Sequence, residues 1–565
     1  MKNRTAVARW RYAVAAGWVL VGLLDPATSR ADLFGHRSQR LQDSFGSTLA
    51  GFALPNDNLG QALASGDFDG DGRDDLAIAD YESLTGEKEG SVHLLYGIQG
   101  PVSPNTQIRD FDPATGASDR EIGDGFGEAL AAGDFNGDGF VDLAIGIPYE
   151  DAGLVPDVGA VLVLYGSQEG LVVAGAPSPQ RYRVGADGLL GTPHADDRWA
   201  SALAAGDFDH DGRDDLAVGC PRCDAFTFQL PVDAGGVWIL YGSATGLSTV
   251  GEDHFDQDSV DALDGAPMLN SCEEGDRFGR ALAAGDFDGD LADDLAVGVP
   301  EEGIGAAGAA GAVQVLYGQT GAGLRVTRNQ FWNESNVATT GAAEAGDGFG
   351  LRLAAGDVTG EGIADLAVGA PREDVGALED AGAVTLLWGQ LGNGLDTPGS
   401  EIYDESQLAN VGFPAAFENF GSTLAIGDFV EQNARGALDL VIGAAQEEVL
   451  DPVTLLTVPL AGAFVVVPGG FGLDPNSAQF WMQGTRSIAG GADLAAGNAF
   501  AYALAAGDFD GDGHHDLAVG APFVDGTTSP GVPTANAGAV YLIFGALFAD
   551  GFGSGDLAAW SVSAP

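Results

Sequence analysis

Closely spaced aspartates are the residues of this chain whose types and spacing could do chemistry. The stretch from Gly66 to Ile78 reads GDFDGDGRDDLAI and places carboxylates at positions 1, 3, 5 and 9 of a loop, which are Asp67, Asp69, Asp71 and Asp75. Gly70 and Gly72 permit a tight turn with unusual backbone dihedral angles. Alternate residues of such a turn can point inward, and the carbonyl of Arg73 at position 7 can complete a cage of oxygens. This cage favours a hard cation, and Ca²⁺ over Mg²⁺ because Ca²⁺ accepts more oxygens in a flexible geometry.

An EF-hand opens with a similar string but needs a bidentate Glu at loop position 12 and flanking helices. Position 12 here is Ile78, inside an apolar run, so the EF-hand and dockerin interpretations fail. We expect the loop at the tip of a hairpin between two strands. A cation there would neutralise the clustered carboxylates and fasten the adjoining strands together.

The acidic string occurs seven times, at spacings of 67 to 80 residues, with first aspartates at Asp67, Asp134, Asp207, Asp286, Asp357, Asp428 and Asp508. Each copy has the same parts in the same order. The copy around Asp286 consists of FGRALAAGDF from Phe278, the acidic loop, a DLAVGVP-type run, GAVQVLYG from Gly311 and RNQFWNES from Arg328. These short runs, bounded by Gly, Pro and Asp, are typical of strands. Four antiparallel strands repeated seven times predict an all-β fold, a seven-bladed β-propeller with the Ala-rich strand innermost.

The two ends of the repeat array predict how the ring closes. The last copy finishes with its third strand, GAVYLIFG from Gly538, and no outer strand follows it. The segment RSQRLQDS, from Arg37 to Ser44, resembles the outer strands but precedes the first copy. We therefore expect this N-terminal strand to complete the last blade and leave no open gap in the ring.

The chain divides into three predicted parts. Residues 1–31 have the layout of a secretory signal peptide, with basic residues before an apolar run from Tyr12 to Leu24 and a small-residue cleavage signal ending at Ala31. Residues 32–547 are the propeller, and residues 548–565 are expected to be a flexible acidic tail. No later stretch could span a membrane, so we expect a secreted protein, extracellular or periplasmic.

The aromatic–Gly pair, the GDFDGDGxxDLA loop and the Gly-x-Pro after it resemble the FG-GAP repeat of integrin α-subunit propellers and of many secreted bacterial proteins. The resemblance covers residues 37 to 545 and implies Ca²⁺ at loop positions 1, 3, 5, 7 and 9. Carried over, these positions are Asp134, Asn136, Asp138, Phe140 and Asp142; Asp207, Asp209, Asp211, Arg213 and Asp215; Asp286, Asp288, Asp290, Ala292 and Asp294; and Asp508, Asp510, Asp512, His514 and Asp516. With the first loop they make about five calcium sites.

Three loops depart from the pattern. Loop four has Leu291 where a Gly is usual. Loop five departs further, and whether it binds a sixth calcium ion stays undecided. Its residues at the five ligand positions are Asp357, Thr359, Glu361, Ile363 and Asp365. Loop six, from Asp428 to Asp439, is three residues too long and is expected to hold no ion.

Charge and cysteine usage restrict the partners and cofactors. The formal net charge of −58 excludes a nucleic-acid partner, because phosphate would be repelled. The spacing of Cys220 and Cys223 could suggest zinc, but the chain has no second such pair. We expect Cys272 to form a disulfide with either Cys220 or Cys223, and a Cys220–Cys223 pair is the alternative.

No constellation of residues predicts catalysis. The chain has no GxSxG, HExxH or phosphate-binding Gly loop, and no histidine has a nucleophile at a meaningful spacing. We therefore expect a binding or cell-adhesion module rather than an enzyme. Its protein or glycan ligand should contact the face opposite the calcium loops, where the insertions 226–232, 261–271 and 524–537 lie. The alternatives are a lyase-like propeller enzyme acting on extracellular polysaccharide and a structural surface component. Ligand identity and oligomeric state stay open.

Overall fold

The structure is a computed structural model. It describes residues 38–41, 56, 58–80, 90–97, 106–108, 123–172, 178–189, 191–224, 232–337, 343–408, 415–430, 436–450, 457–483, 494–529 and 532–544. The predicted signal peptide and the predicted C-terminal tail lie outside these described residues.

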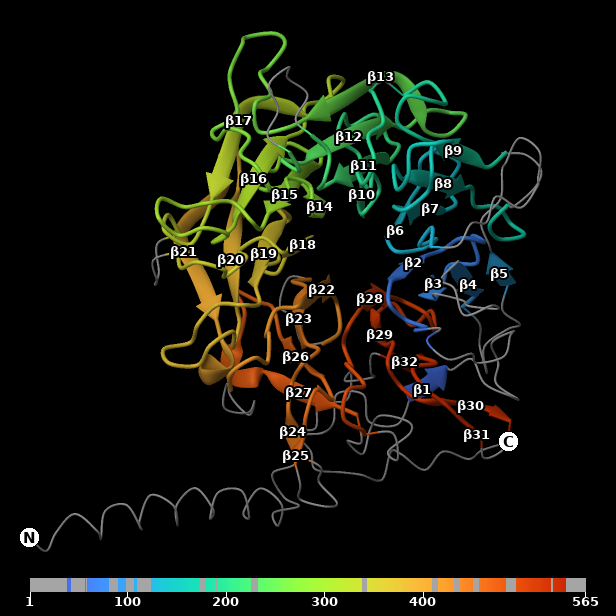
Figure 1. The fold of residues 1–565 in the computed structure, drawn as a ribbon, viewed down its shortest axis with the longest axis vertical. Coiled ribbons are helices and arrows are strands. Elements are labelled where there is room, and N and C mark those ends of the chain that lie inside the picture. Colours follow the sequence, from blue (N-terminus) through green and yellow to red (C-terminus); the bar gives the residue numbers. More distant parts are fainter. Residues whose placement is uncertain are drawn as a thin grey trace, which may run out of the picture.

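Seven four-stranded antiparallel sheets surround a central axis in the described part of the chain, which confirms the all-β seven-bladed propeller (Figure 1). Blade one comprises β2 (Leu63–Gly66), β3 (Asp75–Asp80), β4 (Ser91–Leu95) and β5 (Thr106–Ile108). Blade two comprises β6 (Leu130–Gly133), β7 (Asp142–Ile147), β8 (Ala160–Leu164) and β9 (Gln180–Tyr182). Blade three comprises β10 (Ala202–Gly206), β11 (Asp215–Cys220), β12 (Gly236–Tyr241) and β13 (Ser248–Phe255).

Blade four comprises β14 (Ala281–Gly285), β15 (Asp294–Val299), β16 (Ala312–Tyr317) and β17 (Arg325–Trp332). Blade five comprises β18 (Arg352–Gly356), β19 (Asp365–Ala370), β20 (Ala383–Gln390) and β21 (Gly394–Tyr403). Blade six comprises β22 (Thr423–Gly427), β23 (Asp439–Ala444), β26 (Ala463–Val467) and β27 (Gln479–Met482). Blade seven contains β28 (Leu504–Gly507), β29 (Asp516–Ala521) and β32 (Ala539–Ile543).

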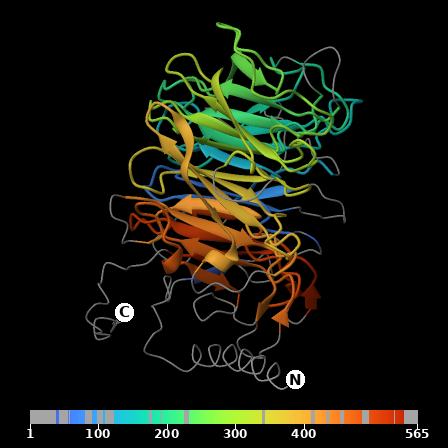
Figure 2. The same ribbon diagram turned by 90° about the vertical axis from the view of Figure 1, so that its left-hand side faces the viewer.

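The outer strand of blade seven comes from the other end of the chain. Strand β1 (Ser38–Leu41) pairs antiparallel with β32, with Ser38 opposite Ile543 and Leu41 opposite Val540. The first strands β2 and β28 of blades one and seven are also in contact, so the ring is closed (Figures 1 and 2). The predicted closure by the N-terminal strand is confirmed.

Two small hairpins are inserted between second and third strands. Blade six carries β24 (Val449–Leu450) with β25 (Thr457–Val458), and blade seven carries β30 (Gly526–Ser529) with β31 (Val532–Thr534). The second of them lies within the predicted insertion 524–537, whereas the first was not expected. Because strands alternate in direction, both hairpins lie on the face opposite the acidic loops. Short 3₁₀ turns follow or precede outer strands at Glu405–Gln407 and Pro475–Ser477.

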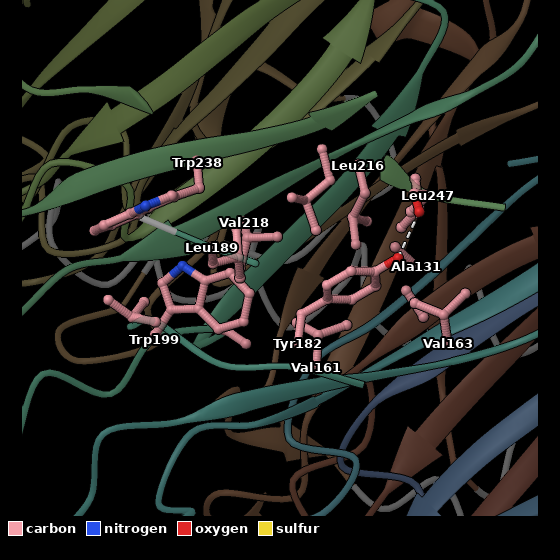
Figure 3. Close-up of a cluster of buried hydrophobic side chains, with 14 of the residues drawn as sticks. Ala131, Val161, Val163, Tyr182, Leu189, Trp199, Leu216, Val218, Trp238 and Leu247 are labelled. Carbon is pink, nitrogen blue, oxygen red and sulfur yellow. Dashed lines mark hydrogen bonds between the residues drawn. The ribbon is translucent and has the colours of Figure 1, made fainter. Parts of the chain in front are cut away.

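The apolar core lies between neighbouring blades. The aromatic residue before the first strand of blades two to seven is fully buried, and it is followed by Gly in four blades and by Ala in two: Phe126, Trp199, Phe278, Phe349, Phe420 and Phe500. Between blades two and three, Val161 and Val163 face Leu216 and Val218 (Figure 3). Burial of each large side chain of this kind contributes about 1.5–3 kcal/mol. The ring is therefore stabilised by sheet-on-sheet packing, and small residues of the first strands allow the blades to converge at the axis.

Polar contacts fix the relative positions of these packed sheets. Between blades two and three, the hydroxyl of Tyr182 donates a hydrogen bond of 2.6 Å to the carbonyl of Leu247, alongside the apolar contacts (Figure 3). Trp199 and Trp238 meet edge to face, with ring centroids 6.3 Å apart. Both tryptophans are buried in packing between the two blades.

The acidic loops also connect the blades. At all seven junctions the N–H of loop position 8 donates to the carbonyl of loop position 1 in the preceding blade, at 2.8–3.1 Å. One of these bonds joins Asp74 of blade one to Asp508 of blade seven and so closes the ring. In three junctions the position-8 carboxylate accepts the N–H of the same position-1 residue, as Asp214 does from Asp134 at 2.7 Å.

The disulfide joins Cys220 to Cys223, and Cys272 is the free cysteine. The expected bridge to Cys272 is therefore wrong, and the alternative pairing is present. The chain turns directly after β11, where the N–H of Cys223 donates to the carbonyl of Cys220 at 3.1 Å and brings the two Cα atoms to 5.4 Å. Cys272 is held elsewhere in the link to blade four, since its N–H donates to the Asp258 carboxylate at 3.2 Å.

Two substitutions of Asp214 distinguish the contribution of its hydrogen bond to stability from the contribution of its charge. Asp214→Ala should lower the free energy of unfolding by about 1–3 kcal/mol, because the N–H of Asp134 loses its side-chain acceptor. Asp214→Asn keeps an acceptor oxygen and removes a carboxylate whose pKa is raised by burial, so it should match or exceed the wild type at neutral pH. Urea unfolding with and without calcium measures both, and equal stability of the two variants would contradict the proposed link.

The disulfide between Cys220 and Cys223 leaves one free thiol per chain, that of Cys272. Burial, with the nearby charges of Asp256 and Asp258, raises the pKa of Cys272 to about 12, so alkylation of the folded protein at pH 8 should be slow. In non-reducing denaturant one thiol should react rapidly, and Cys272→Ser should leave none. Detection of labelled Cys220 or Cys223 by peptide mass analysis would contradict the pairing.

Candidate functional site

Each acidic loop is wound around the carboxylate at its first position. In loop one, Asp67 follows β2 and accepts the N–H of Asp71 at 3.0 Å and of Gly72 at 2.9 Å. The bond to the N–H of position 6 recurs at 2.6–2.9 Å in loops one to five and seven. Gly70 and Gly72 have φ of +70° and +85°, as the sequence predicted for so tight a turn. The loops therefore lie, as expected, at hairpin tips between first and second strands.

The inward-facing side chains bring carboxylate oxygens together. Asp67, Asp69 and Asp71 each offer an oxygen within 4.8 Å of the others, and so do Asp286, Asp288 and Asp290. Burial raises the pKa of Asp69, and the charge of Asp71 adds to this increase. Because oxygens at this spacing are the ligands of hard cations, the residues at positions 1, 3 and 5 could hold Ca²⁺.

Position 3 provides the clearest sign of an absent partner. Among the described residues, Asn136 Oδ1 and Asp209 Oδ1 are buried and accept no hydrogen bond. Burial raises the pKa of Asp209, and Asp207 and Asp211 add to this increase. An unpartnered oxygen that faces two carboxylates fits a metal ligand, and the neutral Asn136 in loop two fits the same role.

The aspartate at position 9 has a structural role that the sequence analysis missed. In all seven blades one of its oxygens accepts the N–H of loop position 2 at 2.8–3.1 Å. In blades one to six the other oxygen accepts a glycine N–H at the end of the third strand, at 2.7–3.0 Å. Burial raises the pKa of Asp75, Asp142 and Asp215 to about 8. In loop three Asp215 also lies with Asp207 and Asp209, so it can contribute to a metal site from the same place.

Position 7 was predicted to supply a carbonyl, and its side chain proves to have a second contact. Phe140 lies directly over Gly70 of the preceding loop, where an added Cβ would come within 2.5 Å of the ring. Arg213 lies over Gly137 in the same way. The guanidinium of Arg73 also pairs with the Asp71 carboxylate at 3.1 Å. Gly70 and Gly137 at position 4 therefore allow close approach of the next blade as well as the turn, whereas loop three has His210 at this position with a φ of +52°.

The three loops that departed from the pattern keep parts of this geometry. Leu291 adopts a φ of +77°, so loop four keeps the turn although a leucine carries the strain. In loop five Thr359 donates its hydroxyl to Asp357 at 3.1 Å, and the Gly362 N–H donates to the same carboxylate. In loop six residues 431–435 lie outside the described residues, and Asp428 pairs with His514 of blade seven at 3.1 Å.

A buried Ser–His–Asp set in blade one was not predicted. Asp80 lies between the other two, accepting from the Ser91 hydroxyl at 2.6 Å and lying 2.7 Å from His93 Nε2. All three residues are buried. Because catalysis by such a set needs the base to contact the nucleophile, this arrangement is a structural network in the blade.

The opposite face carries a pocket of about 390 Å³ between blades five, six and seven. The residues that line it include Arg352, Arg372, Asn419, Gln446, Tyr502 and Phe523, and none of its described lining residues is an Asp or Glu. In a chain with 82 acidic and 24 basic residues, a pocket with two arginines and no acid is unusual.

The arginines of this pocket differ in role. Arg352, at the start of the innermost strand β18, donates to the carbonyls of Ser422 and Leu351 at 2.8 and 2.9 Å. Burial and the charge of Arg280 lower its pKa to about 10. Arg372 is exposed on the turn after β19 and is available for a ligand. Tyr502 and Phe523 meet edge to face, with centroids 5.8 Å apart, and form an aromatic wall.

The predicted insertions surround this face unevenly. The insertion 261–271 packs against blade four, because Arg325 Nε donates to Asp261 at 2.9 Å and the Leu269 N–H donates to Asn329 at 3.0 Å. It leaves Leu263 and Leu269 exposed. Of the insertion 226–232, only Val232 lies in the described part of the chain. None of the described segments forms an apolar helix of membrane-spanning length.

Comparison with known proteins agrees with this architecture. The family model for the FG-GAP repeat matches residues 59–95, 126–164, 199–240, 278–316, 349–387 and 500–543, which are blades one to five and seven. The solved structure of exotype rhamnogalacturonan lyase YesX matches at 11% sequence identity with a TM-score of 0.42. The match covers 90% of this chain and 76% of that chain, and a likeness this weak supports no conclusion about activity.

Among curated proteins, similar stretches occur in integrin α-PS2 of Drosophila melanogaster, 31% identical over 271 residues, and integrin α pat-2 of Caenorhabditis briggsae, 32% identical over 290 residues. Human phosphatidylinositol-glycan-specific phospholipase D is 32% identical over 183 residues. The matches span 46%, 48% and 32% of this chain but only 17%, 20% and 19% of those proteins. With six matched repeats in a closed ring of seven blades, the chain is an integrin α-like FG-GAP repeat propeller.

Proposed function

We propose that this protein is a secreted, calcium-stabilised binding module of the adhesion type, whose ligand contacts the face opposite the acidic loops. The observation that carries the proposal is a pocket without acidic lining residues on the face opposite the acidic loops. Carboxylates gather at the hairpin tips of one face, and the acid-free pocket with Arg352, Arg372 and Tyr502 lies on the other. A metal-dependent face and a separate ligand face suit a module that must be rigid before it binds.

Calcium would be held by loops one, two, three, four and seven through positions 1, 3, 5 and 9, with the position-7 carbonyl in addition. Loop five is a sixth candidate. Extracellular modules bind calcium with dissociation constants of roughly 10⁻⁴–10⁻³ M. At a tenfold excess of calcium over the dissociation constant each site adds about 1.4 kcal/mol to stability by mass action. Five sites would add about 7 kcal/mol, which is comparable with the net stability of a whole domain.

The ligand pocket favours a protein or glycan that presents an anionic group. Arg372 can offer a charged hydrogen-bond donor, Asn419 and Gln446 line the pocket with amides, and Tyr502 offers an aromatic face. The overall charge of −58 would repel an acidic ligand from most of the surface, so binding would concentrate at this pocket. Two alternatives can be told apart by experiment. A lyase-like enzyme would turn over polysaccharide, and a structural component would bind no ligand.

Removal of calcium should lower thermal stability strongly. With EDTA the melting temperature should fall, because the carboxylates of five loops would lose their counter-ions, and excess Ca²⁺ should restore it. Magnesium should restore it less well, since it tolerates fewer and more regular ligands. A melting temperature that EDTA leaves unchanged in differential scanning calorimetry would refute calcium stabilisation.

Ligand capture should depend on both faces. On arrays of glycans and matrix proteins, the protein in calcium should bind an acidic ligand at least tenfold better than in EDTA. Arg372→Glu should abolish capture without changing the melting temperature, because the side chain is exposed.

Arg222→Glu is the matched control for Arg372→Glu. Arg222 holds the same repeat position in blade three, after the second strand, but does not line the pocket. Equal loss of binding in both variants would argue against the pocket. Release of unsaturated sugars from a captured polysaccharide would favour the lyase-like alternative.

A further inference from the structure

A second repeated set of polar residues lies between the blades on the face opposite the acidic loops. One residue follows the second strand of a blade by three positions. One precedes the buried aromatic residue of the same blade by two positions, and one comes just after the outer strand of the preceding blade. At the junction into blade five these are Glu373, Asp347 and Glu334.

All three residues at that junction are carboxyls, and they converge. Each offers an oxygen within 4.8 Å of the others. Glu334 is 7% exposed and Asp347 is 2% exposed. The Glu344 N–H donates to Asp347 Oδ2 at 2.6 Å, which holds one oxygen of Asp347 and orients the carboxylate. Glu334 Oε2 and Glu373 Oε2 are buried and accept no hydrogen bond within the described part of the chain.

The surroundings of this cluster add negative charge instead of neutralising it. Burial, followed by the carboxylates of Glu373 and Asp347, raises the pKa of Glu334. Burial and the charges of Asp347 and Glu344 raise the pKa of Glu373. Because a buried charge must be paired or bind a metal, these oxygens need a positively charged partner or bound protons.

The junction into blade six has glutamates at the same three positions, Glu405, Glu418 and Glu447, and the charge of Glu418 acts on both of the others. Glu405 is 2% exposed and Glu447 is 4% exposed. No donor group of the described residues reaches either oxygen of Glu405 or Glu447 Oε2, and Glu405 and Glu447 are close enough for one proton to be shared between them. The Ala415 N–H donates to Glu418, which matches the orienting bond of Asp347.

Two other junctions carry an amide donor at one of these positions. Into blade four, Gln257 takes the place of Glu334, and its Nε2 donates to Glu302 Oε2 at 2.7 Å, although Glu273, Asp276 and Glu302 still bring carboxylate oxygens together there. Into blade seven the positions hold Gln483, Asn498 and Val524. There Asn498 Nδ2 donates to Gln483 Oε1 at 2.7 Å, and Gln483 Nε2 donates to the Tyr541 hydroxyl at 3.0 Å. The backbone is the same, so the side chains decide whether a donor is present.

We propose that the carboxylate clusters Glu334–Asp347–Glu373 and Glu405–Glu418–Glu447 each bind a hard divalent cation of the Ca²⁺ type, buried between blades and separate from the acidic loops. A shared proton supplies one donor to one oxygen, whereas a hard cation contacts several oxygens at once. Three converging carboxylates with several unpartnered oxygens therefore suit the cation better. The proposal does not depend on the acidic loops or on the ligand pocket.

The test compares the full chain with Glu334→Gln and Glu405→Gln, which introduce the amide that Gln257 provides in blade four. Crystals of each protein grown with Tb³⁺ in place of Ca²⁺ are measured for anomalous scattering. The wild type should show peaks at both clusters in addition to the loops, and each variant should lose the peak at its own cluster alone. Equilibrium dialysis against calcium should count one bound ion fewer per chain in each variant.

Three results would overturn the proposal. The first is filled loop sites with no peak at either cluster, which would leave shared protons as the explanation. The second is an unchanged ion count in both variants. In EDTA each variant should unfold at an equal or higher urea concentration than the wild type, because an amide relieves the like charges. Destabilisation of the variants to the same extent in EDTA and in calcium would indicate a packing role only and would also overturn it.

Discussion

The buried aspartate that opens each second strand is the constraint on which the propeller depends. Its two oxygens hold the N–H of the loop and the N–H at the end of the third strand, so one side chain ties three strands of a blade together. Blade six separates this role from metal binding. Its loop is lengthened, yet Asp439 is fully buried and accepts the N–H groups of Phe429, Val430 and Gly469 at 2.7–2.9 Å. The strand contacts are therefore retained where the loop pattern is lost.

This constraint explains why the carboxylates crowd together. Position 9 must lie under the loop, position 1 must anchor the loop, and the N–H of position 8 must reach position 1 of the preceding blade. In loops that meet these requirements, as in loop one, the side chains of positions 3 and 5 lie close to that of position 1. The like charges that result are unfavourable, as the raised pKa of Asp69 indicates, unless a cation compensates them. On this face of the ring the hydrogen bonding of the loops therefore uses carboxylates at positions 1 and 9.

The sequence predicted the fold well because the signals were local and repeated. Gly70, Gly72 and the aspartates around them define one hairpin tip, and seven copies define the ring. The closing strand could be predicted because the last copy of the repeat lacks an outer strand, and a segment that resembles an outer strand precedes the first copy. The disulfide could not, since the choice between Cys223 and Cys272 depended on a tight turn after β11 that two cysteines three residues apart do not reveal.

The features that sequence reasoning missed join residues far apart in the chain. The pocket draws on three blades, from Leu351 to Phe523, and its significance comes from the acids it lacks. The hairpin of β24 and β25 is too short to show a strand pattern of its own. The carboxylate clusters combine three segments around each junction, and Glu334 and Glu373 differ in sequence context although they share one space.

The repeat supplies its own internal comparison, which is the strongest physical argument available for a propeller. Equivalent positions share a backbone, so a difference between blades isolates the side chain. Gln257 donates a hydrogen bond to Glu302, whereas Glu334 and Glu373 bring together two acceptor groups that only a shared proton or a cation could join. Because burial is similar at both junctions, packing alone does not account for a glutamate at one and a glutamine at the equivalent position of the other. A compensating charge at the acidic junctions does, and it would join each blade to its neighbour on the face that the acidic loops leave unsupported.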